Sequence, residues 1–242
     1  MQTDYAYWLT NRHSKENKHP AIKPIPMPIT KQQLYTLADQ LDDHTKSLFY
    51  ALYLTGGRIS EALELKTTDF NTDNTQQVTV KLNTRKKKRG FPFRYLPLKS
   101  NSPTELNMLN HLLRHKATYE RLGRVKLYDL HRGSAWRKLA KINFTTDAIQ
   151  LNPALKLLNN YEQHLYPHYL RHCRATHLVT DFGFNPFQLQ QYLGWSSVLP
   201  AMVYVHLDWR SASNLLLGIQ QTHGSGEGQE NTSFSNTKSS QD

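Results

Sequence analysis

The sequence predicts a mainly α-helical protein that carries one small antiparallel β-hairpin. Apolar side chains recur at helical spacing along most of the chain, whereas around residues 77–98 they alternate with polar ones, as in a strand. Helix start and stop signals frame the helical segments. With 242 residues, the chain can bury one sizeable core.

The first two helices are expected near residues 30–41 and 44–54. Thr30 is a good N-cap, and Gln33 completes a capping box ahead of an apolar stripe. The second helix ends at the glycine pair that begins with Gly56. A third, short helix is expected directly after this turn.

Serine and asparagine caps introduce later helices. Ser102 precedes Pro103, which suits the first position of a helix, and Asn185 precedes another proline. Gly183 is a stop signal for the helix before it. We expect these helices over residues 103–115, 135–142, 167–181 and 186–192.

The chain divides into three parts. Residues 1–27 are expected to be an irregular arm that ends in a proline-rich stretch, and residues 28–220 to be the folded domain. Residues 221–242 are rich in Ser, Gly, Asn, Gln and Thr. Such a tail cannot bury enough apolar surface to order itself.

The composition indicates which kind of partner and which cellular compartment to expect. The formal net charge of +11 suits a polyanionic partner such as nucleic acid. Cys173 is the only cysteine, which excludes an internal disulfide or a cysteine-based zinc site and favours a reducing, cytoplasmic setting. The longest apolar runs are too short to cross a bilayer. We expect Cys173 to be a buried packing residue and His177 a structural hydrogen bonder.

The segment TGGRISEAL at residues 55–63 is the first of four motifs that carry chemistry. A tight glycine turn leads straight into a helix, so Arg58 lies at a helix start. Its guanidinium and the free backbone N–H groups of the first turn could face the same anion. Taken alone, the motif is better explained by a surface arginine at a helix corner.

The predicted hairpin is the second motif, because it concentrates positive charge. Residues 81–99 contain eight basic residues and no acidic one, and such a stretch repels itself unless phosphates neutralise it. A solvated basic loop is the alternative, but a position at a hairpin tip favours contact with DNA. The residues expected to bind DNA are Arg85, Lys87, Lys88, Arg89 and Arg94.

Two further motifs lie in the last third of the chain. In HYLRH at residues 168–172, His168 and Arg171 are three apart and share one helical face, so they can address one phosphate together. In the later LGWSS segment, Trp195 precedes Tyr204 by nine residues. A lone His–Arg pair, or one tyrosine among 13, is more often structural, so only the combination is informative.

Together, the four motifs resemble the tyrosine recombinase, or phage integrase, family. Its pattern is T-G-x-R-x-S-E-x-L, a lysine on a β-hairpin, H-x-L-R-H-x-x-A-T-H-L, and leucine–glycine–histidine or –tryptophan nine residues before Y-x-H. The chain matches this order from Thr55 to His206. The resemblance implies the tyrosine recombinase catalytic domain, the fold of DNA breaking–rejoining enzymes, over residues 28–220.

The resemblance also implies a site-specific DNA recombinase or integrase that cleaves and rejoins strands through a 3′-phosphotyrosine. Tyr204 is the implied nucleophile, and a phenol loses its proton more readily than a serine hydroxyl does. Arg58 and Arg171 are the implied phosphate ligands, since two guanidiniums can neutralise the growing charge without a metal. Because the phosphotyrosine conserves the energy of the broken bond, no cofactor is expected, neither metal nor ATP.

The remaining roles follow from the same resemblance. His168 is expected to take or hold the tyrosine proton. Trp195 is expected to position and pack, since its indole N–H can donate to a phosphate oxygen but cannot shuttle protons. Lys86 is expected to protonate the departing 5′ oxygen; it is preferred to Lys87 and Lys88 because it lies nearest the strand end.

Double-stranded DNA and further copies of the chain are the expected partners. The apolar segment at residues 215–219 is short and exposed on its own. Members of the family often pass such a C-terminal helix to a neighbouring subunit and form tetramers on DNA. Most members also carry a core-binding domain, for which the arm of residues 1–27 is too short. We therefore expect a minimal recombinase, a fragment, or a protein whose partner supplies that domain.

Three alternatives remain open. A type IB topoisomerase-like enzyme shares the chemistry and would relax supercoils without joining paired sites. A non-catalytic DNA-binding regulator of the same fold would bind DNA and form no covalent adduct. A basic ribosome- or RNA-associated protein fits the charge but leaves the ordered motifs unexplained.

Overall fold

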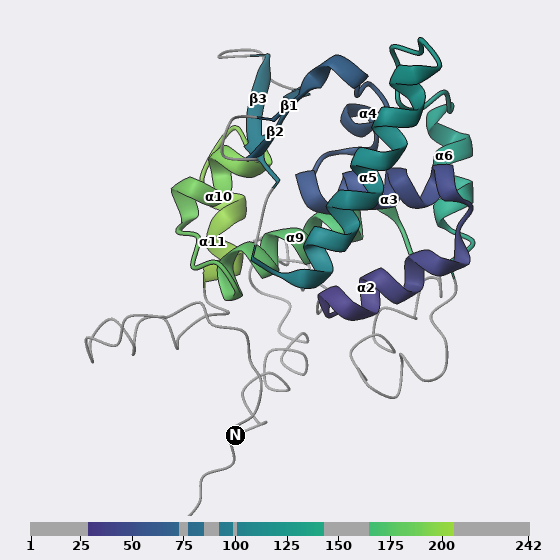
Figure 1. The fold of residues 1–242 in the computed structure, drawn as a ribbon. Coiled ribbons are helices and arrows are strands. Elements are labelled where there is room, and N and C mark those ends of the chain that lie inside the picture. Colours follow the sequence, from purple (N-terminus) through teal and green to yellow (C-terminus); the bar gives the residue numbers. More distant parts are fainter. Residues whose placement is uncertain (1–28, 73–76, 85–91, 99–100, 143–164, 206–242) are drawn as a thin grey trace, which may run out of the picture.

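The computed structural model describes residues 29–72, 77–84, 92–98, 101–142 and 165–205. These residues form helices beside one small antiparallel sheet, which confirms the predicted fold class (Figure 1). Short 3₁₀ helices lie at Ala38–Gln40 and Thr67–Asp69. The α-helices are α2 (Lys31–Leu37), α3 (Asp43–Thr55), α4 (Ile59–Ala62), α5 (Pro103–Arg121), α6 (Arg132–Leu139), α9 (Pro167–Thr180), α10 (Pro186–Leu193) and α11 (Leu199–Val205).

The helices begin and end at capping signals that the sequence carries. The Thr30 side chain accepts from the Gln33 backbone N–H, and the Gln33 side chain accepts from the Thr30 N–H, so the predicted capping box is formed. Gly56 ends α3 in the left-handed conformation, with φ of 56°, which favours glycine. Helix α5 continues to Arg121, past its predicted end near residue 115.

The sheet contains the predicted hairpin and one additional strand. Strands β2 and β3 pair antiparallel, with Val80 opposite Leu96. The first strand was not predicted, because three residues are too few to display an alternating pattern. In spatial order the strands are β1 (Phe70–Thr72), β2 (Val78–Asn83) and β3 (Phe93–Pro97).

Helix α3 forms the centre of the core. Its residues from Ser47 to Thr55 are all buried, so this helix is enclosed on every side. It packs against α5 and α9. Figure 1 shows α9 between α10 and α11 on one side and α2, α3 and α5 on the other. Leu170, Cys173 and Leu178 of α9 are buried, which confirms the prediction made for Cys173.

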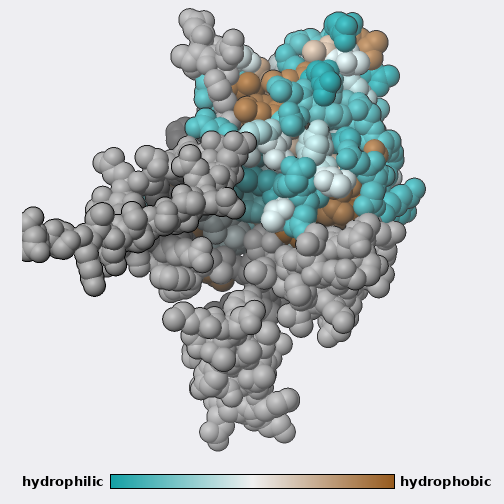
Figure 2. Space-filling model, turned by 60° about the horizontal axis from the view of Figure 1, so that its bottom comes forward, coloured by the Kyte–Doolittle hydropathy of each residue, from teal (hydrophilic) through white to brown (hydrophobic). Residues whose placement is uncertain are grey.

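The face shown in Figure 2 is mostly hydrophilic over the described residues, with hydrophobic residues in small separate groups. Within the described part of the chain, no helix has the length and apolar character needed to cross a membrane. The domain boundaries predicted at residues 27–28 and 220–221 lie outside the described residues and stay predictions.

Candidate active site

Arg58 lies at the N-cap of α4, directly after the glycine turn that ends α3. Its backbone N–H donates to Glu61 Oε2 at 3.0 Å, and its Nη1 donates to Glu61 Oε1 at 2.8 Å. The turn is fixed by a hydrogen bond from the Gly57 N–H to Thr55 Oγ1. The side chain of Arg58 stays 25% exposed, so its guanidinium is both held and accessible.

Arg171 lies on α9 and is only 2% exposed. Its two terminal nitrogens donate to the carbonyl oxygens of Gly56 and Leu193, each at 2.7 Å. Its guanidinium carbon also lies 5.5 Å from the centre of the Trp195 ring. Both hydrogen-bond acceptors are neutral, so these contacts orient the guanidinium but leave its charge uncompensated.

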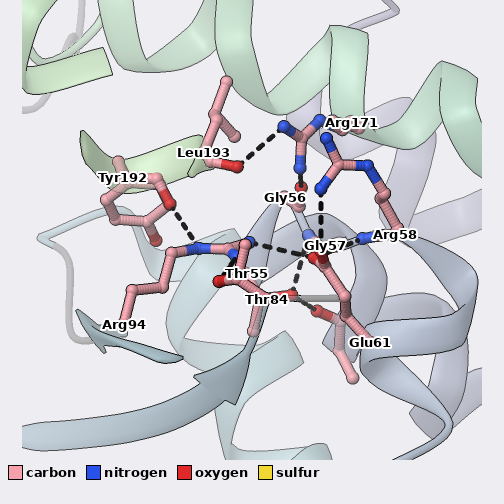
Figure 3. Close-up of polar contacts among 11 residues, drawn as sticks. Thr55, Gly56, Gly57, Arg58, Glu61, Thr84, Arg94, Arg171, Tyr192 and Leu193 are labelled. Carbon is pink, nitrogen blue, oxygen red and sulfur yellow. Dashed lines mark hydrogen bonds and ion pairs between the residues drawn. The ribbon is translucent and has the colours of Figure 1, made fainter. Parts of the chain in front are cut away.

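The two arginines predicted to share a phosphate are brought together. Figure 3 shows the guanidiniums of Arg58 and Arg171 beside each other above the glycine turn. The pKa of Arg171 falls to about 9, because burial and then the positive charges of Arg58 and Arg94 lower it, while Glu61 opposes them. A group of three cations around one carboxylate has an excess of positive charge that an anion would relieve.

Tyr204 lies on α11 and contacts Trp195, which in turn contacts Arg171. Its side chain is 2% exposed, and its ring stacks on Trp195 with centroids 5.8 Å apart. Burial raises the pKa of Tyr204, and the charge of Arg171 acts in the opposite direction. The phenol hydroxyl lies 2.5 Å from Nδ1 of His172. Arg171, Trp195 and Tyr204 are therefore one contiguous cluster.

The imidazole bonded to the phenol belongs to His172, a residue that the sequence reasoning did not place in the site. Burial lowers the pKa of His172 to about 4, followed by the charges of His168 and Arg171. At neutral pH the ring is therefore neutral, so Nδ1 can accept while the Tyr204 hydroxyl donates. His168 is exposed and contacts His172 edge to face, with centroids 4.8 Å apart. The four-residue spacing of these histidines on α9 was the available signal.

Arg94 was predicted to bind DNA, and the structure directs its guanidinium toward protein groups. Its side chain is 9% exposed and points inward. Arg94 lies opposite Leu82 in the sheet, and paired residues share a face; Leu82 is fully buried, so Arg94 faces the interior as well. The alternation of β3 therefore aims this cation at protein groups, including Glu61.

The remaining predicted residues of the hairpin tip lie outside the described residues. These are Arg85, Lys86, Lys87, Lys88 and Arg89. The choice of Lys86 as proton donor and the phosphate contacts of its neighbours stay predictions. Two roles predicted elsewhere have clear geometry. Trp195 contacts both the phenol ring and Arg171. His177 bonds through Nδ1 to the Tyr53 hydroxyl at 2.8 Å, as a structural hydrogen bonder does.

The glycine turn, the paired arginines and the stacked tyrosine together define a class of protein. Residues 28–210 match the phage integrase family, so the chain belongs to this family, the tyrosine recombinases. The tyrosine recombinase XerD of Rickettsia prowazekii is 25% identical over 231 residues, which cover 90% of this chain and 72% of that protein. XerC of Roseiflexus castenholzii is 27% identical over 168 residues, covering 69% and 48% respectively.

Solved structures confirm the fold. The XerH site-specific recombinase, in a post-cleavage complex with a palindromic difH substrate, is similar with a TM-score of 0.55 and 21% identity. The match covers 83% of this chain and 56% of XerH, so the chain spans little more than half the length of that structure. The XerA recombinase is similar with a TM-score of 0.52 and 18% identity, over 81% of this chain and 66% of XerA.

Proposed function

We propose that this protein is a site-specific recombinase that cleaves and rejoins double-stranded DNA through a 3′-phosphotyrosine at Tyr204. One observation carries the proposal: Arg58 and Arg171, from separate segments, lie side by side, and Trp195 contacts both Arg171 and Tyr204. The charge balance of this group suits a phosphodiester. The membership of the chain in the tyrosine recombinase family supports the same reaction.

Phosphate binding is assigned to the two arginines. The carbonyls of Gly56 and Leu193 orient the Arg171 guanidinium before any ligand arrives. Glu61 orients Arg58 in the same way. Donors that are already in place lose little entropy when the charge on the non-bridging oxygens grows, so they favour the transition state. Trp195 packs against Arg171 and keeps water from that side of the site.

The chemical step is an attack of the Tyr204 oxygen on phosphorus. The phenol proton passes toward the imidazole pair, in which His172 touches the hydroxyl and His168 is exposed to solvent. The new phosphorus–oxygen bond replaces the bond to the 5′ oxygen, which leaves with a proton from Lys86 of the hairpin. The reverse attack by a 5′ hydroxyl restores the strand and frees Tyr204.

Helix α11 must shift before this reaction. Tyr204 is 2% exposed, so a phosphate cannot reach the phenol oxygen while α11 packs against α9 in this arrangement. Docking of DNA beside Arg58 and Arg171 would supply the free energy for this movement.

The proposal includes assembly of several copies on DNA, as a tetramer joined through the segment at residues 215–219. Helices α10 and α11 expose large apolar side chains, which is typical of a surface that a partner covers. An accessory or core-binding partner is part of the same proposal, as is a cytoplasmic, DNA-associated location. The exposed residues are Phe187 at 67%, Leu199 at 73%, Met202 at 41% and Val203 at 36%.

The proposal is tested with a nicked duplex that traps the covalent intermediate. Wild-type protein is expected to give an adduct on a denaturing gel, and Tyr204→Phe none, because no other oxygen replaces the phenol. Tyr166→Phe is the matched control, since Tyr166 is a half-buried tyrosine that influences the pKa of Tyr204. It should still form the adduct.

The other outcomes separate the alternatives. An adduct that persists in Tyr204→Phe would remove this residue as the nucleophile. DNA binding without any wild-type adduct would favour a non-catalytic regulator. Adduct formation with relaxation of supercoils, but without joining of paired sites, would favour a topoisomerase-like enzyme.

A further inference from the structure

We infer that Arg94 is a positioning residue that ties the basic hairpin to both phosphate-binding arginines. The inference rests on the proposed function, because it assigns a task toward the same phosphate. It concerns a side chain that touches neither the phenol nor the expected phosphate. Figure 3 shows Arg94 below that pair, with its guanidinium directed at three different parts of the site.

The first contact of Arg94 is with the hairpin. Its Nη1 donates to Thr84 Oγ1 at 3.0 Å. Thr84 is the last described residue before the basic tip, and its N–H donates to the Pro92 carbonyl at 2.6 Å, which closes the base of the tip. Thr84 and Arg94 therefore join the two strands where the segment of residues 85–91 leaves them.

The second contact leads to Arg58. Nη2 of Arg94 donates to Glu61 Oε2 at 3.2 Å, and the same oxygen accepts from the Arg58 backbone N–H. The other oxygen of Glu61 accepts from the Arg58 guanidinium. The side chain of Glu61 is fully buried. Its position, and with it the direction of Arg58, therefore depends on the cation on its far side.

The third contact leads to Arg171. Nε of Arg94 donates to the carbonyl of Tyr192 at 2.9 Å, and the next carbonyl along the chain, that of Leu193, accepts from Arg171. Two consecutive carbonyls at the negative end of α10 thus hold one arginine each. Gly194 follows with φ of 67°, and a Cβ there would lie 2.8 Å from Nη1 of Arg94, so glycine leaves the space that Arg94 occupies.

A simple stabilising ion pair would require only the contact with Glu61. Here each of the three guanidinium nitrogens is used. They reach the hairpin, the carboxylate that also binds Arg58, and the carbonyl next to the one that binds Arg171. The planar fork of arginine can serve three directions at once, whereas lysine offers a single charged nitrogen. Arg94→Lys therefore keeps the charge and loses the geometry, which makes it the informative variant.

The experiment measures single-turnover cleavage of a nicked duplex at saturating DNA, together with DNA affinity and the midpoint of thermal unfolding. Arg94→Lys is expected to slow cleavage by about tenfold or more, since small displacements of catalytic groups are costly. Its DNA affinity should remain within about threefold of wild type, because Arg94 neutralises no exposed phosphate. Thr84→Val, which removes only the hairpin contact, should show a smaller loss of the same kind. Thr79→Val on the same strand is the matched control and should behave as wild type.

Two results would overturn the inference. One is cleavage by Arg94→Lys at the wild-type rate, or a loss no larger than its loss of folded protein. The other is a fall in DNA affinity that accounts for the whole fall in rate, which would make Arg94 a DNA contact.

A second measurement is independent of cleavage and separates this inference from the proposed function. Inorganic sulfate should raise the unfolding midpoint of wild type and of Thr79→Val by occupying the arginine pair. Arg94→Lys should weaken that shift. If wild type forms no adduct but this pattern holds, the proposed function fails and the positioning role stands. A full sulfate shift in Arg94→Lys would count against the positioning role.

Discussion

Helix α9 presents two similar groups of side chains one turn apart, and they differ in one respect. Arg171 lies beside His172, which bonds to Tyr204, and Arg174 lies on the same helix as His177, which bonds to Tyr53. Both arginines are nearly buried, at 2% and 3% exposure. In both groups burial raises the pKa of the tyrosine and lowers that of the histidine to about 4.

The two groups differ in whether a carboxylate contacts the arginine. Arg174 donates to Glu105 Oε1 at 2.8 Å and to the Tyr192 hydroxyl at 3.2 Å. Burial lowers the pKa of Arg174, but Tyr192 and Glu105 outweigh it and raise the value. Arg171 instead donates to two carbonyls, and its pKa falls to about 9. The charge of Arg174 is thus neutralised within the protein, whereas that of Arg171 is available to an incoming anion.

The largest effect should come from removing each arginine in turn. Arg171→Met is expected to reduce adduct formation by about a hundredfold or more, as loss of a charge-stabilising donor does. Its free energy of unfolding should stay close to that of wild type, because no buried carboxylate loses a partner. Arg174→Met should lose about 3–5 kcal/mol of stability, since the buried Glu105 carboxylate loses its 2.8 Å partner and keeps only longer contacts with Lys31 and Tyr53. Urea unfolding and single-turnover cleavage measure the two quantities.

A double variant tests whether the buried Glu105 carboxylate causes the loss of stability in Arg174→Met. Arg174→Met combined with Glu105→Leu should recover much of the lost stability, because the buried carboxylate is gone. The comparison is contradicted if Arg171→Met is the less stable protein, or if the double variant is no more stable than Arg174→Met.

The second-largest expected effect is a dependence of stability on pH. His172 and His177 titrate near pH 4 when folded and near 6.5 when unfolded. Between these values the unfolded chain binds more protons, so stability falls as the pH falls from 6.5 to 4 and is insensitive to these groups above 6.5. Each histidine contributes at most about 1.4 kcal/mol per pH unit inside that window.

Urea unfolding at several pH values from 4.5 to 7.5 measures this slope. His172→Gln and His177→Gln should each flatten it, and the double variant should flatten it most. Asp42 acts in the same direction only below this range, between pH 3.8 and about 2. Burial raises its pKa, but the Thr45 N–H and Lys138 lower it by more. An unchanged slope in the double variant would show that neither histidine is held neutral by the fold.

The sequence predicted what depends on near neighbours in the chain. The capping box at Thr30, the glycine stop at Gly56 and the hairpin of β2 and β3 are all encoded within a few residues. The meeting of Arg58 with Arg171 was predicted by a different route, since only the resemblance to a family linked two residues so far apart. Their roles in catalysis remain predictions until the variants are measured.

What the sequence did not predict is the choice of partner among distant polar groups. Glu105 lies in the first turn of α5, and its carboxylate pairs with Arg174 of α9. Arg94 belonged to a run of basic residues, and only the register of β3 shows that it turns inward. No local pattern distinguishes a cation that will meet a buried carboxylate from one that will stay exposed, because the partner is supplied by another element.

The smallest expected effect is the binding of a simple anion. Inorganic sulfate should stabilise wild type by about 1.4 kcal/mol at ten times its dissociation constant, by occupying the space between Arg58 and Arg171. Arg171→Met should lose most of this gain, whereas Arg174→Met, although less stable, should keep it, because Arg174 already has a carboxylate. Sodium chloride at matched ionic strength controls for general screening. Equal stabilisation of both variants by sulfate would mean that the anion binds elsewhere, and the contrast between the two arginines would then carry no information about ligand binding.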